Sequence, residues 1–423
     1  MIANFGAQRL WLGTQMLAAL SVLPSVLPGT LASTSGLAFP VAERNEQPPT
    51  IIEDQDGRAL AAFYDLLSSV SRRESVARII HYGDSHVAAD LMTGELRRDL
   101  TAVFGDAGPG FAVPIREFST RGNVATTRSS GWKVVGLTRE DLVHDSALGL
   151  AGLCLGTEAA GEWIKVMTAA SRIDLYLLEQ PLGGKIEVFL DGSIYESPLN
   201  LNASVFNPRY LTIDATQGRA HEIEIRTITP GRVKVLGISA EQNAPGIVYD
   251  ALGINGARAG RPLLWNWSLL ASNIERCDPD LIVLAYGTNE AGDVDLDFAE
   301  YASRFRTMLD RFRKAAPRAS LLVIGPTDRA VTVGKRWRTI DRLPALIDVQ
   351  RSVARAAGAA FFDLFQTMGG EGSIERWVHA EPPLAQADRV HLTAAGYRLL
   401  GDKLFDALMR GYFESLAESS WTR

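Results

Sequence analysis

The sequence predicts an α/β fold: a parallel sheet with helices on both faces, into which an antiparallel β-sandwich of jelly-roll type is inserted. Four apolar runs have the length and composition of buried strands, and helix-like stretches separate the later ones. The runs lie at 76–82, 281–286, 320–325 and 359–363, and the helix-like stretches at 298–315 and 343–357. This alternation is typical of a parallel sheet whose ligands bind at the carboxyl ends of its strands.

The interval from about 111 to 244 has a different apolar period. Residues 185–190 alternate between polar and apolar side chains and run into Asp191-Gly192, a strong hairpin-turn pair. Residues 221–226 alternate again, and 232–238 follow a Pro-Gly turn. Short strands at regular spacing predict an antiparallel sandwich. The predicted domains are a first α/β part at 58–110, the insert at 111–245 and a second α/β part at 246–423.

The N-terminus has the composition of a secretory signal peptide, which we place at 1–38. Arg9 precedes an apolar stretch that runs to Leu27, and small-residue cleavage sites follow it. An uncleaved membrane anchor is the alternative, although two prolines interrupt the short apolar stretch. Residues 39–57 contain prolines and charges without periodicity, and we assign them to a linker.

Composition excludes several classes of partner. The chain has 423 residues and a formal net charge of -6, which argues against nucleic acid or an anionic membrane surface as the main partner. Cys154 and Cys277 are expected to be buried free thiols, and a disulfide between them stays open because the leader indicates an oxidising compartment. No Cys/His spacing suits a metal ion.

The motif Gly83-Asp84-Ser85-His86 is the most informative in the chain, because it follows the apolar run at 76–82 and opens a helix-like stretch near Val87. In this context the Ser85 hydroxyl is expected at the carboxyl edge of the sheet, with its N–H among the unpaired donors of a helix start. Asp84 is expected to stabilise the turn. A Gly-Asp-Ser triplet alone is most often an ordinary turn, so the other motifs must decide.

Three further segments supply groups that can act together with a serine. Asp388 stands three residues before His391, so that its carboxylate can orient the imidazole of a general base. Asn289 follows the apolar run at 281–286 and a glycine turn, and Gly256 lies in a second glycine-bearing turn. Either residue could also have a purely structural role in its turn. The order Ser, Gly, Asn, His at junctions of strands and loops favours one catalytic constellation.

These motifs resemble the SGNH (GDSL-type) hydrolase superfamily, and most of all the bacterial extracytoplasmic polysaccharide and peptidoglycan O-acetylesterases. The resemblance covers roughly residues 58–408 and departs from the commonest pattern at His86 and Glu290, two variants that suit the esterase subgroup. It implies a three-layer, flavodoxin-like domain with an inserted carbohydrate-binding-module-like sandwich. The implied catalytic residues are Ser85, Asp388 and His391, and the implied oxyanion-hole donors are Ser85, Gly256 and Asn289.

The resemblance also implies the reaction. It points to a serine esterase that removes O-acetyl groups from a cell-envelope or extracellular polysaccharide, peptidoglycan included, through an acyl-enzyme and without cofactor or metal. The implied partner is the acetylated polysaccharide, with no nucleic acid and no stable transmembrane segment after signal removal. The implied location is the periplasm or the medium. Two alternatives stay open: an O-acetyltransferase that uses the same site, and a glycan-binding protein without catalysis.

Overall fold

The computed structural model describes residues 50–115, 124–144 and 146–421. The signal peptide expected at 1–38 and most of the linker expected at 39–57 lie outside the described residues. From Thr50 onward the chain forms one compact unit. Among the helices described, none has both the length and the apolar character that a membrane span requires.

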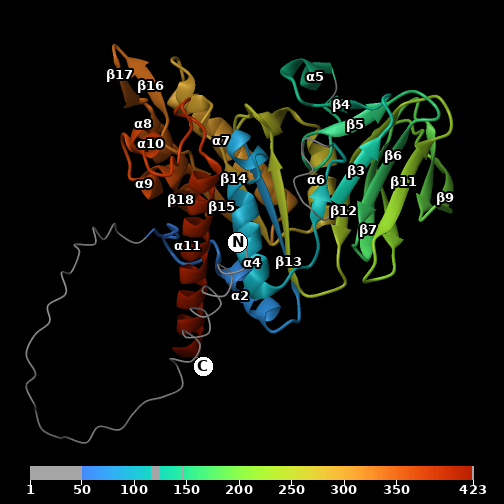
Figure 1. The fold of residues 1–423 in the computed structure, drawn as a ribbon, viewed down its shortest axis with the longest axis horizontal. Helices are drawn as coiled ribbons and strands as arrows, with labels where there is room; N and C mark the ends of the chain where they lie inside the picture. Colours follow the sequence, from blue (N-terminus) through green and yellow to red (C-terminus); the bar gives the residue numbers. More distant parts are fainter. Residues whose placement is uncertain (1–49, 116–123, 145, 422–423) are drawn as a thin grey trace, which may run out of the picture. The chain divides into compact units, whose positions relative to one another are not determined.

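A five-stranded parallel sheet forms the centre of the α/β part, in the order β13-β1-β14-β15-β18 (Figure 1). Its strands are β1 (Val76–Gly83), β13 (Gly246–Gly253), β14 (Leu281–Ala285), β15 (Ser320–Gly325) and β18 (Ala360–Asp363). All neighbouring pairs run parallel, so every strand ends at the same edge of the sheet. The four predicted strands are therefore present, and the predicted parallel sheet is confirmed.

Helices cover both faces of this sheet. Successive strand residues point to opposite faces, so Ile80 and Tyr82 pack into one core and Ala77 and Ile79 into another. The helices of the first core are α6 (Trp267–Cys277), α7 (Phe298–Ala315) and α8 (Leu343–Ala356). Those of the second are α2 (Ala61–Ser71), α4 (Met92–Phe104), α9 (Leu364–Met368), α10 (Ser373–Val378) and α11 (Ala394–Trp421).

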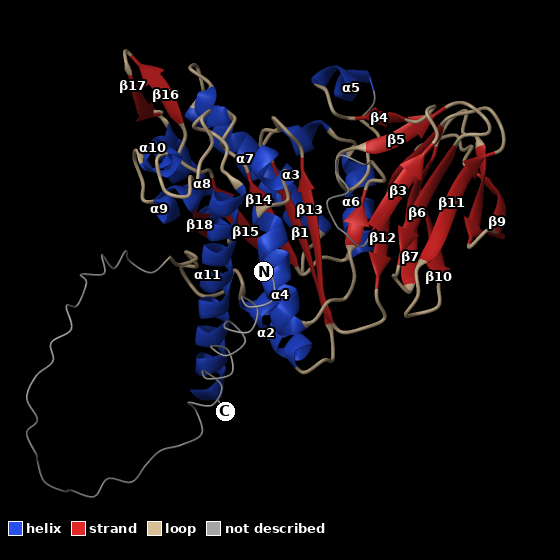
Figure 2. Ribbon diagram, in the orientation of Figure 1, coloured by secondary structure: helices blue, strands red, loops and turns tan. Residues whose placement is uncertain are grey.

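The insert consists of two antiparallel sheets, as the alternating pattern predicts (Figure 2). One has the order β10-β7-β12-β5-β4 with β2 paired to β12, and the other has the order β3-β6-β11-β8-β9. The strands are β2 (Gly110–Ala112), β3 (Val124–Arg128), β4 (Lys133–Val135), β5 (Cys154–Thr157), β6 (Trp163–Thr168), β7 (Arg172–Glu179), β8 (Lys185–Leu190), β9 (Ser193–Asn200), β10 (Asn207–Asp214), β11 (His221–Thr227) and β12 (Val233–Glu241), and a short helix α5 (Arg139–His144) lies between β4 and β5. Asp191 and Gly192 both have positive φ, at 51° and 78°, and make the predicted hairpin turn between β8 and β9.

The sandwich and the α/β part share one core instead of meeting at a thin interface. Buried residues of both sandwich sheets belong to the same cluster as α6 and α7. The Tyr82 hydroxyl donates to the Leu150 carbonyl oxygen over 2.9 Å. Arg78 makes an ion pair with Glu241 at 2.7 Å. The insert is therefore built into the fold, and its removal would uncover apolar side chains that pack with the parallel sheet.

Two elements differ from the expectation. The helix expected from about Val87 is broken into a single turn, α3 (Ser85–Ala88), and the separate helix α4, because Asp90 adopts a positive φ of 48° between them. A two-stranded hairpin, β16 (Ala330–Val333) and β17 (Arg336–Thr339), lies in the connection from β15 to α8, where no element was expected. Both differences lie at the carboxyl edge of the sheet.

Candidate active site

The candidate residues gather at the carboxyl edge of the parallel sheet, although their positions span three hundred residues. Ser85 follows β1, Gly256 follows β13 and Asn289 follows β14, which are adjacent strands. Asp388 and His391 lie in the loop that precedes α11. Parallel topology therefore brings the sequence-predicted residues to one place.

The turn that carries Ser85 is held by its neighbours. The Asp84 carboxylate accepts the backbone N–H of His86 at 3.0 Å, so Asp84 is the turn-stabilising acceptor expected of it. A Cβ on Gly253 would approach the backbone nitrogen of Ala88 to 2.0 Å. Only glycine at the end of β13 therefore lets α3 lie this close to the sheet, which fixes the place of the Ser85 side chain.

Ser85, His391 and Asp388 form a continuous chain of hydrogen bonds. The Ser85 Oγ lies 2.9 Å from the His391 Nε2, and the His391 Nδ1 lies 2.7 Å from the Asp388 Oδ2. The Asp388 Oδ1 also accepts the backbone N–H groups of Val390 and His391 at 3.0 Å each. Partial burial would raise the pKa of Asp388, but its hydrogen bonds to the imidazole and these N–H groups outweigh burial and hold that pKa below its usual value. An ionised Asp388 fixes one His391 tautomer, with Nε2 free to accept the hydroxyl proton.

A second aromatic layer lies behind the imidazole. The His86 ring is tilted against the His391 ring with centroids 5.5 Å apart, and the His86 Nδ1 lies 3.0 Å from the Tyr397 hydroxyl of α11. Burial lowers the pKa of His86, so this ring stays neutral beside His391. The sequence placed His86 in the turn but gave no sign of its partner Tyr397, which is 311 residues away.

Three groups that follow the adjacent strands β1, β13 and β14 are the candidate hydrogen-bond donors to a substrate oxygen. Among the described residues, the backbone N–H groups of Ser85 and Gly256 donate to no other group. Gly256 is exposed, with φ at +71° and no neighbouring atom where a Cβ would stand. The Asn289 Nδ2 donates to the Ala257 carbonyl oxygen at 2.8 Å, and its second hydrogen remains available. These donors are of the kind that an oxyanion hole requires.

Glu290 ties together the turns that carry Gly256 and Asn289. Its Oε1 accepts the Ala259 N–H at 2.7 Å, next to the bond from Asn289 to Ala257. The side chain is 3% exposed, and burial raises its pKa to about 7. Sequence reasoning noted Glu290 only as a variant of the family pattern, since nothing local indicates its contact across 31 residues.

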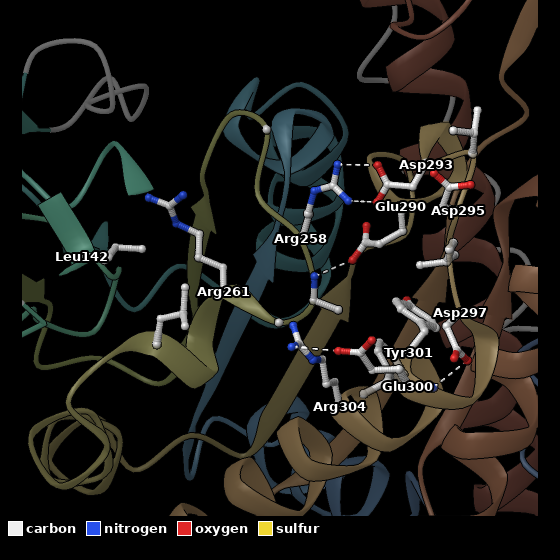
Figure 3. Close-up of a pocket in the computed structure, with 17 residues that line it drawn as sticks. Leu142, Arg258, Arg261, Glu290, Asp293, Asp295, Asp297, Glu300, Tyr301 and Arg304 are labelled. Carbon is white, nitrogen blue, oxygen red and sulfur yellow. Dashed lines mark hydrogen bonds and ion pairs between the residues drawn. The ribbon is translucent and has the colours of Figure 1, made fainter. Parts of the chain in front are cut away.

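A cavity of about 750 Å³ opens beside the Gly256 turn (Figure 3). The turn after β13, the segment from Glu290 to Asp297 and the start of α7 line its wall. Arg258 pairs with Asp293, and Arg304 pairs with Glu300 on this wall (Figure 3). The Glu290 Oε2 is buried here without a hydrogen-bond partner in the described part of the chain. The cavity thus gives a polar ligand room next to the Gly256 N–H.

His81, His379, Cys154 and Cys277 take no part in the hydrogen bonds that join Ser85, His391 and Asp388. The His81 Nδ1 lies 2.7 Å from the Tyr249 hydroxyl, and burial lowers the pKa of His81 to about 3. His379 is exposed and pairs with Glu375 of its own helix. Cys154 and Cys277 are buried free thiols, in agreement with the expectation.

Comparisons with known proteins relate part of the chain to a hydrolase family. Residues 230–399 match the model of the GDSL-like Lipase/Acylhydrolase family, a range that includes Gly256, Asn289, Asp388 and His391 and begins after Ser85. A GDSL lipase of Mycobacterium tuberculosis is 33% identical over 129 residues, which are 30% of this chain and 48% of that protein. The chain therefore spans about half the length of this relative.

A solved structure resembles the chain over most of its length. The structure titled "Peptidoglycan O-acetylesterase in action" superposes with a TM-score of 0.72 and 25% identity. The similarity covers 86% of this chain and 99% of the other. It therefore includes the inserted sheets as well as the parallel sheet.

Proposed function

The chain is a GDSL-type (SGNH) hydrolase, and on that basis we propose that it is a serine esterase that removes O-acetyl groups from an extracytoplasmic polysaccharide. The observation that carries the proposal is the hydrogen-bonded series Ser85–His391–Asp388 beside two free backbone N–H groups. This is the arrangement that acyl transfer through a serine requires. Peptidoglycan is the first substrate to test, because the solved structure that matches over most of the chain is a peptidoglycan O-acetylesterase.

The proposed reaction has two steps. The His391 Nε2 takes the proton of the Ser85 hydroxyl while Oγ attacks the acetyl carbonyl carbon, and the resulting oxyanion is bound by the Ser85 N–H, the Gly256 N–H and the Asn289 amide. The imidazolium then returns the proton to the sugar oxygen, which leaves as a hydroxyl. Water attacks the acetyl-enzyme with His391 again as base, so that acetate is released and Ser85 is restored.

Exposure of the site favours hydrolysis over transfer to another sugar. The His391 side chain is 37% exposed and the Asp388 side chain 45%, so water reaches the imidazole that must activate it for attack on the acetyl-enzyme. An acetyltransferase needs a site that keeps water from the acyl-enzyme. We therefore place acetyl transfer second.

The substrate class is supported by the inserted sandwich. Its position between the Ser85 turn and the Gly256 turn in the chain is that of a domain which can hold a polymer beside the cleft. We propose that residues 111–245 bind glycan, and that the expected leader directs the protein out of the cytoplasm. Binding energy from remote sugar units would then help to orient the acetyl group at Ser85.

The test measures acetate release from O-acetylated peptidoglycan, acetylated xylan and acetylated alginate, with a deacetylated acceptor glycan added in parallel. We expect acetate from at least one polymer and none with Ser85→Ala. Acetyl groups that appear on the acceptor instead of as acetate would favour the transferase. A wild-type protein that cleaves neither polymer nor small acetyl esters would contradict the proposal.

A further inference from the structure

The hairpin β16–β17 stands at the carboxyl edge of the sheet, next to the candidate site. It follows β15, which is the neighbour of β14, and Asn289 follows β14. Figure 2 shows the two strands extending beyond α8 and α10. Ala330 and Thr339 at its base are buried, whereas every side chain from 331 to 338 is exposed.

The base of the hairpin is fastened to the loop that carries Asp388 and His391. The Ala330 N–H donates to the Arg389 carbonyl oxygen at 3.1 Å. The Arg389 guanidinium lies over the Trp337 ring, 4.5 Å from its centroid, and its Nε donates to Glu375 at 3.0 Å. Trp337 therefore contacts the Asp388–His391 loop directly, through Arg389.

The charge of this hairpin is opposite to that of the whole chain. Four basic residues and no acidic residue occur from Arg329 to Ile340, in a chain with a net charge of -6. Arg329 is turned inward and donates to the Thr288 carbonyl oxygen at 2.6 Å. Lys335, Arg336 and Arg338 are exposed, and none of the three has an ion-pair partner in the described part of the chain.

The same hairpin exposes apolar surface. Val331 is 41% exposed, Val333 54% and Trp337 38%. Because Val331 is opposite Arg338 and Val333 opposite Arg336, these four side chains lie on one face of the ribbon, and Trp337 lies on the other with Thr332. Exposed aromatic and apolar side chains among unpaired cations are typical of a binding surface.

We propose that β16–β17 is a binding arm for an anionic polysaccharide. The hairpin follows β15, whereas the inserted sandwich leads into β13 at the other edge of the sheet. A sugar ring packs on Trp337 beside Arg389 on one face of the ribbon, and the polymer continues past Lys335 at the turn so that its carboxylates lie against Arg336 and Arg338 on the other face. This inference rests on the proposed function, since it takes the bound polymer to be the substrate. Charge complementarity favours a polymer with carboxylates over a neutral one.

The test compares kcat/KM on O-acetylated peptidoglycan, whose peptides carry carboxylates, with kcat/KM on a small acetyl ester. We expect the ratio to fall about ten-fold in the triple variant Lys335→Gln, Arg336→Gln, Arg338→Gln, as three exposed charge contacts would give. Added salt should lower the ratio of the wild type and leave that of the triple variant nearly constant. The matched control is Arg398→Gln, Lys403→Gln, Arg410→Gln on α11, which changes the net charge equally and should keep the ratio.

Trp337→Ala separates stacking from charge. It should lower the ratio on both peptidoglycan and neutral acetylated xylan, whereas the triple variant should lower it on peptidoglycan alone. An unchanged ratio in both hairpin variants would overturn the inference, as would an equal loss on xylan in the triple variant. Binding to anionic lipid vesicles that the triple variant abolishes, without a change in the glycan ratio, would make the hairpin a membrane contact instead.

Sedimentation with insoluble peptidoglycan separates this inference from the proposed function. We expect Ser85→Ala protein to sediment with the polymer, and the same protein with the triple substitution to remain in solution. One outcome is that the wild type sediments with the polymer in a way that depends on the hairpin and yet releases no acetate from any glycan. That result would refute the proposed function and support the binding arm. Acetate release that the hairpin substitutions leave unchanged would support the proposed function and refute the binding arm.

Discussion

His391 is held at both ring nitrogens, by Asp388 on one side and Ser85 on the other. All three side chains are at least partly exposed, so truncating them opens no core cavity. We expect Ser85→Ala and His391→Ala each to lower kcat/KM on a small acetyl ester by about three orders of magnitude or more. Circular dichroism should show an unchanged fold, and near-normal turnover in either folded variant would exclude the mechanism.

Asp388→Asn tests the orienting carboxylate alone. The amide can still occupy the position next to the His391 Nδ1, but it favours the wrong imidazole tautomer. The loss in kcat on the small ester should therefore be as large as that of His391→Ala or smaller. A loss larger than that of His391→Ala would mean that Asp388 holds the loop rather than the tautomer.

Glu290 should make the stability of the protein depend on pH. Its folded-state pKa of about 7 lies above the ordinary 4.5, so the folded protein binds this proton more tightly than the unfolded chain. The free energy of unfolding should then fall as pH rises from about 4.5 to 7, by about 3 kcal/mol for this group at about 1.4 kcal/mol per pKa unit. Urea unfolding at several pH values should show this decrease in the wild type and a smaller one in Glu290→Gln. An equal dependence of the free energy of unfolding on pH in the two proteins would contradict the raised pKa of Glu290.

The residue scale also shows where sequence reasoning stops. Ser85, Asn289 and the Asp388–His391 pair could be picked out because each stands in a local motif beside a strand or helix end. The contacts of Glu290 with Ala259 and of His86 with Tyr397 depend on where distant segments meet. A single sequence does not show which distant segments come into contact.

At the scale of elements, the close approach of α3 to β13 determines where Ser85 lies. A Cβ on Gly253 would clash with backbone atoms of α3, which cannot turn aside as a side chain can. Gly253→Ala should therefore displace α3 and lower both the melting temperature and kcat/KM on a small ester, the latter by about ten-fold or more for a displacement near 1 Å.

Gly94→Ala is the matched control for that substitution. Gly94 lies within α4, and a Cβ there would approach its nearest neighbour, an Arg97 nitrogen, only to 3.6 Å. This change should raise stability by about 0.5–1 kcal/mol because alanine favours helices. A Gly253→Ala protein that equals the control in activity and melting temperature would show that α3 has room to spare.

Elements with a strong apolar period could be predicted, and elements set by tertiary contacts could not. Strands β1, β14, β15 and β18 and helices α7 and α8 follow the expected ranges within a few residues. The hairpin β16–β17 has exposed side chains and therefore no buried face to leave a period in the sequence. The break between α3 and α4 depends on the backbone of Asp90, a residue type that favours helices only weakly.

At the scale of the whole molecule, the sandwich and the α/β part should unfold together. Their buried side chains form one cluster, and Trp265 of the α/β part packs against Gly152 of the insert. We expect a single calorimetric transition whose calorimetric and van't Hoff enthalpies agree. Two separable transitions would show that the sandwich is an independent domain. Deleting the sandwich would then be a valid test of its role.

The separation of Ser85 and His391 in the chain has a consequence for synthesis. The two residues are 306 positions apart and meet only through a sheet whose strands come from both ends of the described chain. During synthesis Ser85 leaves the ribosome long before His391 does. Contacts between residues so far apart in the chain form late in folding. Esterase turnover would thus begin only in finished molecules, so a nascent or truncated copy cannot strip acetyl groups ahead of time.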